Sequence, residues 1–318
     1  MEQLPLSGRQ LRLRSGAYEA DLASVGASLR TLRHAGRDLV VPYAADEVRP
    51  GFRGMTLAPW PNRVVGGRYR WRDEELQLAV SEPSRGAALH GLVGWLDFEV
   101  TSASESSATL TATIEAQAGY PWRVLVETTY RLADDGLTQS VRGTNLGAEP
   151  APWGAGPHPY LVAGPGTVDD WILELPADQV LDVRRDCLSP LGLSVVDLDE
   201  PERFDFRVPR PVGTVQIDHA FTDLPDIDAE VSVRVTTARG EGVAMTWDPT
   251  VCPWVQIHTT DLPGGPATPG HRGGLAVEPM TCAPDAFNHA RYEHDTGLTV
   301  LAPGASASAS WRISALPA

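Results

Sequence analysis

Two strand-like runs meet at a turn in the stretch from Trp122 to Asn145, which reads WRVLVETTYRLADDGLTQSVRGTN. The first run ends at Leu132, the second begins at Leu137, and Ala133-Asp134-Asp135-Gly136 joins them. An Asp-Gly pair between such runs is a strong signal for a tight turn. The stretch therefore predicts an antiparallel β-hairpin.

The same pattern of short runs and turns continues along the chain, and helical periodicity is almost absent. Hydroxylated and apolar residues alternate in 109–114, valines alternate with polar residues in 231–235, and serines alternate with alanines in 305–310. Many short antiparallel strands predict a large all-β sandwich or a barrel. No linker or repeat divides the chain, so we expect one domain over residues 1–318. The Gly- and Pro-rich segment 262–274 is expected to be an irregular loop.

Composition narrows the function classes. Among the 318 residues, 42% are hydrophobic and 21% charged, as in soluble globular proteins, and the net charge of −15 argues against nucleic acid as a partner. Every basic residue is Arg, which excludes a lysine Schiff base. Cys187, Cys252 and Cys282 predict neither a disulfide framework nor a structural zinc site. The N-terminal Met1–Pro5 has no signal-peptide pattern and no apolar run reaches membrane-spanning length, so a cytoplasmic protein is expected.

One carboxylate lies in a run that is otherwise typical of a buried strand. Glu278 follows Leu275 and Val277 and precedes Met280, and the next charge along the chain is Asp285. Because burying an acid among such neighbours costs free energy, Glu278 is expected to be either paired or functional.

Two histidines have unusual neighbours. His158 lies between two prolines in Gly154-Ala155-Gly156-Pro157-His158-Pro159, and a stiff backbone of this kind suits a catalytic acid as well as a structural turn. His90, in Ala-Leu-His-Gly, fits a core histidine or a residue that lines a site next to a sharp turn at Gly91.

Other polar residues could bind a polyol. Asn62 and Arg63 follow the rigid Pro59-Trp60-Pro61, although a surface ion pair is the commoner role of a lone Arg. Asp218 follows a strand-like run, where it could reach a ligand or simply form a turn. The tryptophans could stack on sugar C–H faces or belong to the core.

A metal site is a further alternative. His90, His158, His219 and Glu278 are residue types that bind Fe or Zn, but no two of the histidines have a metal-type spacing and none lies three or four residues from Glu278. We therefore expect no metal.

Taken together, the sequence resembles the aldose 1-epimerase (galactose mutarotase) family. The motifs that carry the resemblance occur in order between Arg53 and Asn288, namely Pro59-Trp60-Pro61-Asn62-Arg63, Leu89-His90-Gly91, His158-Pro159-Tyr160, Asp218-His219-Ala220-Phe221, Glu278-Pro279-Met280-Thr281 and Pro284-Asp285-Ala286-Phe287-Asn288. The resemblance implies a large antiparallel β-sandwich with an open sugar site, a free aldose as substrate and no cofactor. We expect a monomer or a weak homodimer.

The resemblance also implies residue roles. Glu278 would take the proton of the anomeric hydroxyl, and His158 would deliver one to the ring oxygen. Arg63, His90 and Asp218 would hold and polarise the sugar together with Asn62, and Trp254 would form an aromatic wall. Ala87 and Leu92 stand where the family often has Asn and Gly, which puts the usual hexose preference in doubt.

Such chemistry needs an ionised Glu278 and a protonated His158 near neutrality. Free Glu and His side chains titrate near about 4.3 and about 6.5, so a carboxylate beside His158 would have to raise its pKa. The expected pH profile is a bell with Glu278 on its acid limb and His158 on its alkaline limb. Three alternatives stay open: a hexose-6-phosphate 1-epimerase using Arg53, Arg68 and Arg272, a non-catalytic sugar-binding protein, and a metal-dependent sugar isomerase.

Overall fold

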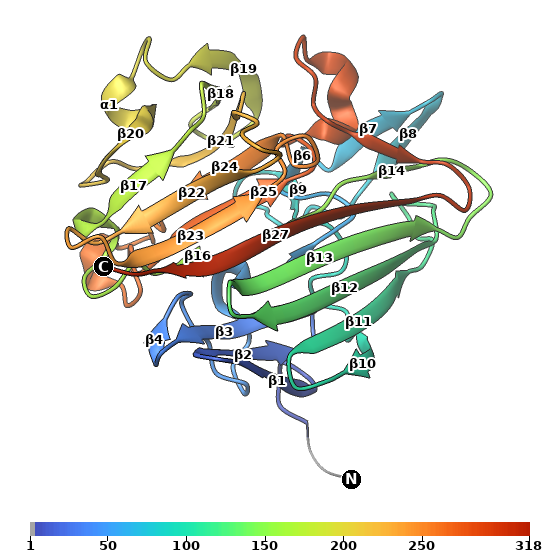
Figure 1. Ribbon diagram of the computed structural model, residues 1–318. Helices are drawn as coiled ribbons and strands as arrows, with labels where there is room; N and C mark the ends of the chain where they lie inside the picture. The colour runs from blue at the N-terminus through green and yellow to red at the C-terminus, as the bar shows by residue number, and fades with distance from the viewer. Residues whose placement is uncertain (1–3) are drawn as a thin grey trace.

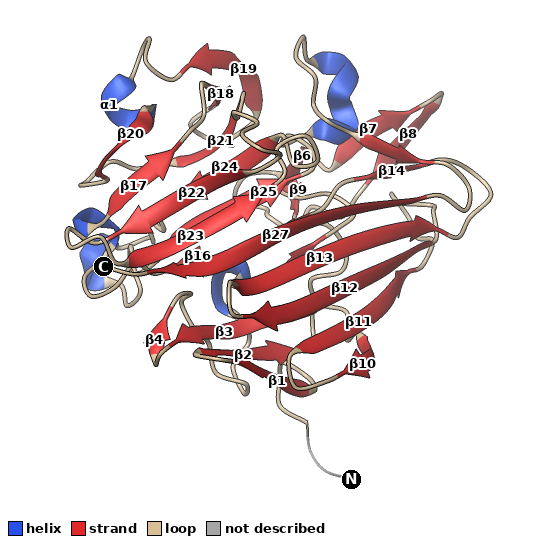
Figure 2. Cartoon of the chain, viewed as in Figure 1, coloured by secondary structure: helices blue, strands red, loops and turns tan. Residues whose placement is uncertain are grey.

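Antiparallel strand pairing accounts for nearly all regular structure in the computed structural model, which describes residues 4–318 (Figures 1 and 2). The predicted hairpin is confirmed: residues 124–133 pair with residues 136–145, and Ala133 lies opposite Gly136. Gly136 has φ 128°, and a Cβ there would lie 2.3 Å from the Ile313 carbonyl oxygen. Glycine is therefore required at this turn.

The largest sheet contains nine strands. Their order is β10 (Glu99–Ala103), β11 (Ser107–Ile114), β12 (Val124–Ala133), β13 (Gly136–Asn145), β27 (Ser306–Leu316), β23 (Gly242–Trp247), β22 (Val231–Thr236), β17 (Ile172–Leu175) and β20 (Phe206–Pro211). The last strand, β27, lies between β13 and β23 (Figure 1). Residues near the C-terminus therefore connect the two halves of this sheet.

A second sheet contains six strands, and a third contains four. The six-stranded sheet runs in the order β16 (Tyr160–Leu161), β25 (Leu275–Met280), β24 (Trp254–His258), β21 (Asp218–Thr222), β18 (Gln179–Val183) and β19 (Pro190–Val195). The four-stranded sheet is the N-terminal meander of β1 (Gln10–Ser15), β2 (Tyr18–Ala23), β3 (Ser28–His34) and β4 (Arg37–Asp38).

Short elements complete the structure. The strand pairs are β5 (Thr56–Leu57) with β15 (Gly156–Pro157), β6 (Arg63–Val65) with β9 (Ala87–Leu89), β7 (Arg68–Trp71) with β8 (Glu74–Gln77), and β14 (Ala151–Trp153) with β26 (Thr299–Leu301). The helical elements of residues 4–318 are α1 (Pro201–Phe204) and the 3₁₀ turns η1 (Pro50–Phe52), η2 (Val168–Asp170), η3 (Gly265–Ala267) and η4 (Ala286–Arg291). The expected scarcity of helix is confirmed, and segment 262–274 is irregular apart from η3.

The main core forms between the nine- and six-stranded sheets, as in a β-sandwich. Val126 and Met245 of the nine-stranded sheet belong to the same buried cluster as Ile257 and Val277 of the six-stranded sheet. Because side chains alternate across a strand, Gln256 and Glu278 point to the opposite face of the six-stranded sheet. That face is also buried, and it carries the candidate site.

Three remaining expectations can be compared with this structure. The three cysteines are free, and Cys252 and Cys282 are fully buried. Within residues 4–318, no helix has the length and hydropathy needed to cross a bilayer. The segment Met1–Pro5, predicted not to be a signal peptide, includes Met1–Gln3, which lie outside the described residues.

Candidate active site

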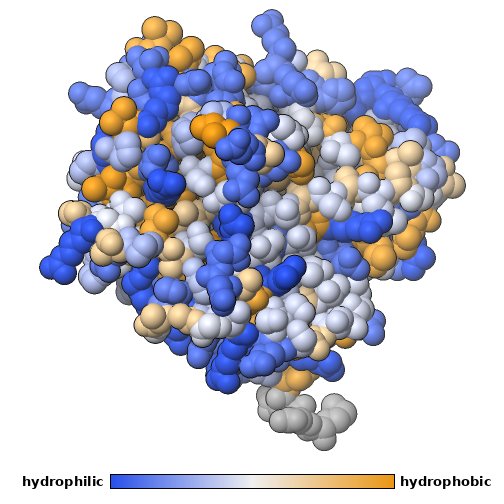
Figure 3. Space-filling view, in the orientation of Figure 1, coloured by the Kyte–Doolittle hydropathy of each residue, from blue (hydrophilic) through white to orange (hydrophobic). Residues whose placement is uncertain are grey.

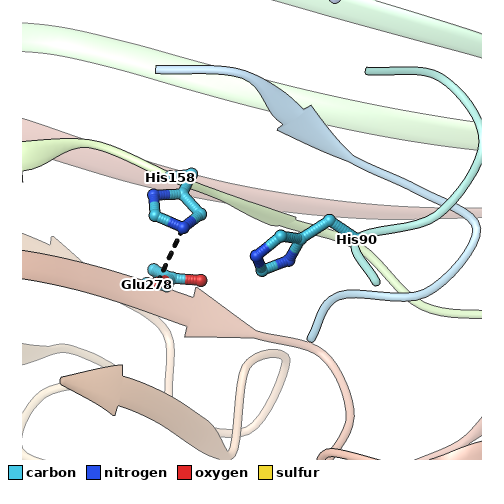
Figure 4. A group of neighbouring side chains, drawn as sticks. All are labelled: His90, His158 and Glu278. Carbon is cyan, nitrogen blue, oxygen red and sulfur yellow. Dashed lines mark ion pairs between the residues drawn. The ribbon is translucent and has the colours of Figure 1, made fainter. Parts of the chain in front are cut away.

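A carboxyl group and an imidazole meet beneath the surface. Nε2 of His158 lies 3.4 Å from Oε1 of Glu278, with 5% and 2% of the two side chains exposed (Figure 4). Glu278 comes from β25, and His158 lies between β15 and β16, which pairs with β25. The Gly54 amide donates to the His158 carbonyl at 2.7 Å and helps to fix this residue. The structure thus brings together the predicted acid and base.

His90 completes a compact group with these two residues. Its ring centroid lies 4.9 Å from that of His158, and the two planes are nearly perpendicular at 85° (Figure 4). The sharp turn expected here is present, because His90 and Gly91 have φ of 61° and 77°. A Cβ on Gly91 would lie 2.0 Å from the Ala58 carbonyl oxygen, so only glycine fits.

Arg63 is held beside this group by a buried ion pair. Its Nε and Nη2 donate to the two oxygens of Glu82 at 2.7 and 3.0 Å, and 11% of its side chain is exposed. The commoner alternative of a solvated surface pair is therefore wrong. Asn62 is buried, and its side-chain oxygen accepts from the Arg63 amide at 2.9 Å. The same oxygen accepts from Nη1 of Arg63 at 3.5 Å, so Asn62 helps to orient the Arg63 side chain.

The strand that carries Arg63 is fixed from the far end of the sequence. The Asp285 amide donates to the Arg63 carbonyl at 2.7 Å, and Oδ1 of Asp285 accepts from the Val65 amide at 2.8 Å. Asn288 and Tyr292 donate to the same carboxyl group. The motif at 284–288 therefore positions the site without lying in it.

Asp218 lies on the same face, two strands away from Glu278. Its Oδ1 accepts from Nε2 of Gln256 at 2.7 Å, and its carboxylate oxygens lie 3.9 Å from Nδ1 of His258 and from Nη2 of Arg85. Gln256 is the direct neighbour of Glu278 across the β24–β25 pair. Gln256 therefore lies between the two carboxyl groups and donates to that of Asp218.

Gln256 and His258 were not predicted from the sequence. The alternation from Trp254 to His258 does place both on one strand face, but it does not indicate which face the site occupies. His219 lies on the opposite face, where its ring packs 4.8 Å from Phe204.

Trp254, the predicted aromatic wall, lies on the same sheet face as Glu278. It is 1% exposed and packs with Leu181, Ala220 and Met280, and its contact with a sugar stays a prediction.

Two aromatic rings lie against the histidines of the site. The centroid of Phe52, in η1, lies 5.0 Å from that of His90 and 6.0 Å from that of His158, and the centroid of Tyr160 lies 5.1 Å from that of His158. Phe52 is half-buried and has φ 59°, a strained conformation for a bulky residue.

Burial determines the protonation of the pair. It lowers the pKa of His158 to about 3, assisted by the nearby His258 and opposed by Asp218. It raises the pKa of Glu278 well above its usual range, and the charge of Asp218 adds to this shift while Arg63 opposes it. Both shifts favour the uncharged forms, a neutral imidazole and a protonated carboxyl, whereas the sequence predicted an ionised pair. The main cause is the loss of water around both groups, which penalises their charged forms.

The neighbouring groups differ in their charge. Burial lowers the pKa of His90 well below its ordinary value, and the nearby His158, Arg63 and His258 add to this shift. Burial alone would raise the pKa of Asp218, but His258, Arg63 and Arg85 lower it, so this carboxylate is ionised. The site therefore presents a fixed anion, a fixed cation and a neutral acid–imidazole pair.

Several buried polar atoms of this group have no hydrogen-bond partner within residues 4–318. They are Nδ1 of His90, Nδ1 of His158 and Oε2 of Glu278. Buried polar groups are nearly always paired, so these three atoms offer hydrogen-bonding positions that water or a polar ligand can fill.

The same three residues could hold a metal ion. Each offers a ligand atom, and these atoms lie within 4.8 Å of one another. The wide spacing in the sequence did not predict this arrangement, because the ligands come from three separate segments. His219 is not part of it.

The chain is similar in sequence to a known family over most of its length. The family model described as aldose 1-epimerase matches residues 9–314. The uncharacterized protein YihR of Escherichia coli K12 is 35% identical over 284 residues, which cover 89% of this chain and 87% of YihR.

Solved structures match the fold. A galactose mutarotase-like protein from Clostridium acetobutylicum aligns with a TM-score of 0.83 at 18% identity, covering 99% of this chain and 97% of the other. A galactose 1-epimerase from Lactobacillus acidophilus aligns with a TM-score of 0.77 at 16% identity, covering 96% and 94%.

Proposed function

The chain belongs to the aldose 1-epimerase family, and from this premise we propose that it interconverts the α and β anomers of a free aldose by acid–base ring opening and reclosure. The observation that carries the proposal is the buried contact of 3.4 Å between His158 and Glu278, with unpaired polar atoms around it. Mutarotation requires one group that accepts a proton and one that donates a proton at the two ends of an O–C–O unit.

In the proposed reaction, Glu278 accepts the proton of the anomeric hydroxyl as His158 protonates the ring oxygen. The C1–O5 bond breaks, C1 becomes an aldehyde, and rotation about C1–C2 followed by the reverse transfers gives the other anomer. Each proton transfer contributes on the order of a hundredfold or more to the rate. No net electron transfer or covalent intermediate is needed.

The pair needs a single proton between its two groups. In the free site Glu278 carries it, so the assigned roles require its transfer to His158 when sugar binds. Sugar hydroxyls would donate to Oε2 of Glu278 and accept from His158, and both contacts stabilise the charged form. The nearby Arg63 favours the carboxylate in the same way.

The other residues are proposed to hold the sugar. Arg63 and His90 border the pair, and Asp218 offers an ionised acceptor on the same sheet face. Asn62 would contribute by orienting Arg63. We keep a single domain, a cytoplasmic location, a monomer or weak homodimer, and the absence of a cofactor as predictions.

A hexose 6-phosphate is the second candidate substrate. Two of the arginines considered for its phosphate are already engaged: Arg272 donates to Asp169 and Asp261 and is 4% exposed, and Nε of Arg68 donates to Gln77. The geometry therefore favours a neutral aldose over the phosphate.

Polarimetry tests the proposal. Freshly dissolved α-D-glucose, α-D-galactose, α-L-arabinose and α-D-glucose 6-phosphate would be followed with wild type, with Glu278→Gln and with the exposed control Glu149→Gln. We expect faster decay to the same final rotation with wild type and with the control, and none with Glu278→Gln. No acceleration of any sugar would refute the enzyme and favour the sugar-binding protein, and loss of activity with a chelator would favour the metal-dependent isomerase.

A further inference from the structure

A cavity of about 1040 Å³ adjoins the acid–base pair. Asp218 and His258 form its inner wall, the turn after β18 forms a second wall, and α1 forms a third. Its lining includes neither Glu278 nor His158, so a sugar held at the pair leaves this space open. Pockets of about 300–1,000 Å³ hold drug-sized ligands, and this volume exceeds the need of one pyranose.

The cavity lies beyond Asp218 as one crosses the six-stranded sheet from Glu278. From Glu278, the next strand contributes Gln256, and the strand after that contributes Asp218. Two strand spacings amount to about 9.5 Å, so a ring that begins at Glu278 ends near Asp218. The cavity starts where that first ring would end.

The chemistry of the lining suits a neutral molecule rich in hydroxyl groups. Six carboxylates and three guanidinium groups line the cavity, so it offers many acceptors and donors but a net negative charge. Apolar side chains, among them Val183 and Leu188, interrupt the polar ones. Hydroxyls around apolar C–H faces are the pattern of a pyranose ring, whereas an anionic ligand would meet excess acid.

The donors are partly fixed in advance. Nε of Arg203 donates to the Gln216 carbonyl at 3.0 Å, and its guanidinium lies 4.7 Å from the centre of the Phe204 ring. Arg85 stands at the junction with the acid–base site, 3.4 Å from Glu82 and 3.9 Å from Asp218, with no side-chain hydrogen bond among residues 4–318. Its Nε faces Glu82, and its Nη groups can donate to a ligand. Figure 3 shows that apolar and hydrophilic side chains are mixed over the region of α1 and β19.

We propose that this cavity is a second saccharide subsite, which takes the ring attached to a reducing-end aldose. The inference rests on the proposed function. In it, the reducing unit lies over His158 and Glu278, Asp218 and Arg85 lie at the glycosidic junction, and the second ring lies between α1 and the turn after β18. The preferred substrate class is then a reducing disaccharide.

The test compares glucose with disaccharides whose reducing unit is glucose, namely maltose, cellobiose and melibiose. Mutarotation would be measured with wild type, Arg203→Ala, the exposed Arg185→Ala and the distant control Arg72→Ala. We expect at least one disaccharide to have a higher kcat/KM than glucose. Its kcat/KM should fall about tenfold in Arg203→Ala or Arg185→Ala, as for loss of a charged hydrogen bond, with glucose within twofold. The control should change neither.

The failures of the two proposals differ. If glucose is converted but no disaccharide is better, or if the variants affect both sugars equally, the second subsite is overturned and the epimerase is retained. If no sugar is converted, the epimerase fails, and calorimetric titration of wild type and variants with maltose and glucose decides the subsite. Tighter binding of maltose that Arg185→Ala weakens would support it, and equal affinities would refute it.

Discussion

Replacing Glu278 with glutamine should stabilise the protein at neutral and alkaline pH while it abolishes activity. The folded protein keeps a proton on Glu278 above the ordinary pKa of 4.5, because burial raises the pKa of this carboxyl group. The unfolded chain releases that proton. Stability of the wild type therefore falls as pH rises from 4.5 through the raised pKa, and glutamine has no proton to lose.

The magnitude follows from the proton difference. Each pH unit within this window costs the wild type up to about 1.4 kcal/mol relative to Glu278→Gln. His158 contributes in the opposite sense, since its lowered pKa makes stability fall as pH drops below 6.5, but it does so in both proteins. The difference between the two proteins isolates Glu278.

Urea denaturation at pH 5, 6, 7 and 8 would measure this effect. Wild type, Glu278→Gln and the exposed control Glu149→Gln would be compared at each pH. We expect the advantage of Glu278→Gln to increase with pH and the control to follow wild type. A constant difference across the four pH values would refute the raised pKa, and with it the neutral pair.

Three further predictions concern the same site. The value of kcat/KM should stay high well below pH 6.5, because His158 takes up a proton only near its pKa of about 3. It should fall on the alkaline side, where Glu278 loses the proton that the pair needs. Polarimetry across pH measures both limbs, and an acid limb near 6.5 would contradict this prediction. The substitution Phe52→Gly removes the ring next to His158 and places glycine at a φ of 59°, which glycine adopts readily. Circular dichroism should show a folded protein, and kcat/KM should fall up to about tenfold, since an aromatic contact contributes ~0.5–1.5 kcal/mol. Unchanged kinetics would exclude Phe52 from the site. The substitution Glu82→Gln weakens two charged hydrogen bonds from Arg63 and should lower the free energy of unfolding, measured in urea, by about 1.5–3 kcal/mol. A loss below roughly 0.5 kcal/mol, as for a surface ion pair, would argue against a buried ion pair.

Local patterns in the sequence predicted the sheet elements well. The Asp-Gly turn fixed the β12–β13 hairpin, and alternation identified β22 and β27. These features depend on neighbouring residues alone. The apolar run around Glu278 likewise indicated a buried strand with an unusual acid, as the structure has it.

The site could be predicted only in part, because its properties arise from residues distant in sequence. The sequence pointed to His158 and Glu278, and the structure brings them together. The sequence could not place Phe52 against both histidines, nor pack Trp254 against Leu181 and Ala220, since both contacts depend on how distant segments come together on the six-stranded sheet. The pKa of His158 was expected to be raised, and its lowered value has the same cause. The segments that pack over His158 and Glu278 exclude water from them, and the residues next to each in the sequence do not predict which segments these are.

Exchange between anomers at equilibrium shows whether Glu278 and His158 together open and close the sugar ring. In a solution of equilibrated glucose, magnetisation transfer between the two anomeric protons reports ring opening and reclosure without any change in composition. We predict exchange far above the buffer rate with wild type and with Glu149→Gln, and the buffer rate with Glu278→Gln or His158→Gln. Exchange that survives either substitution at the pair would contradict the account.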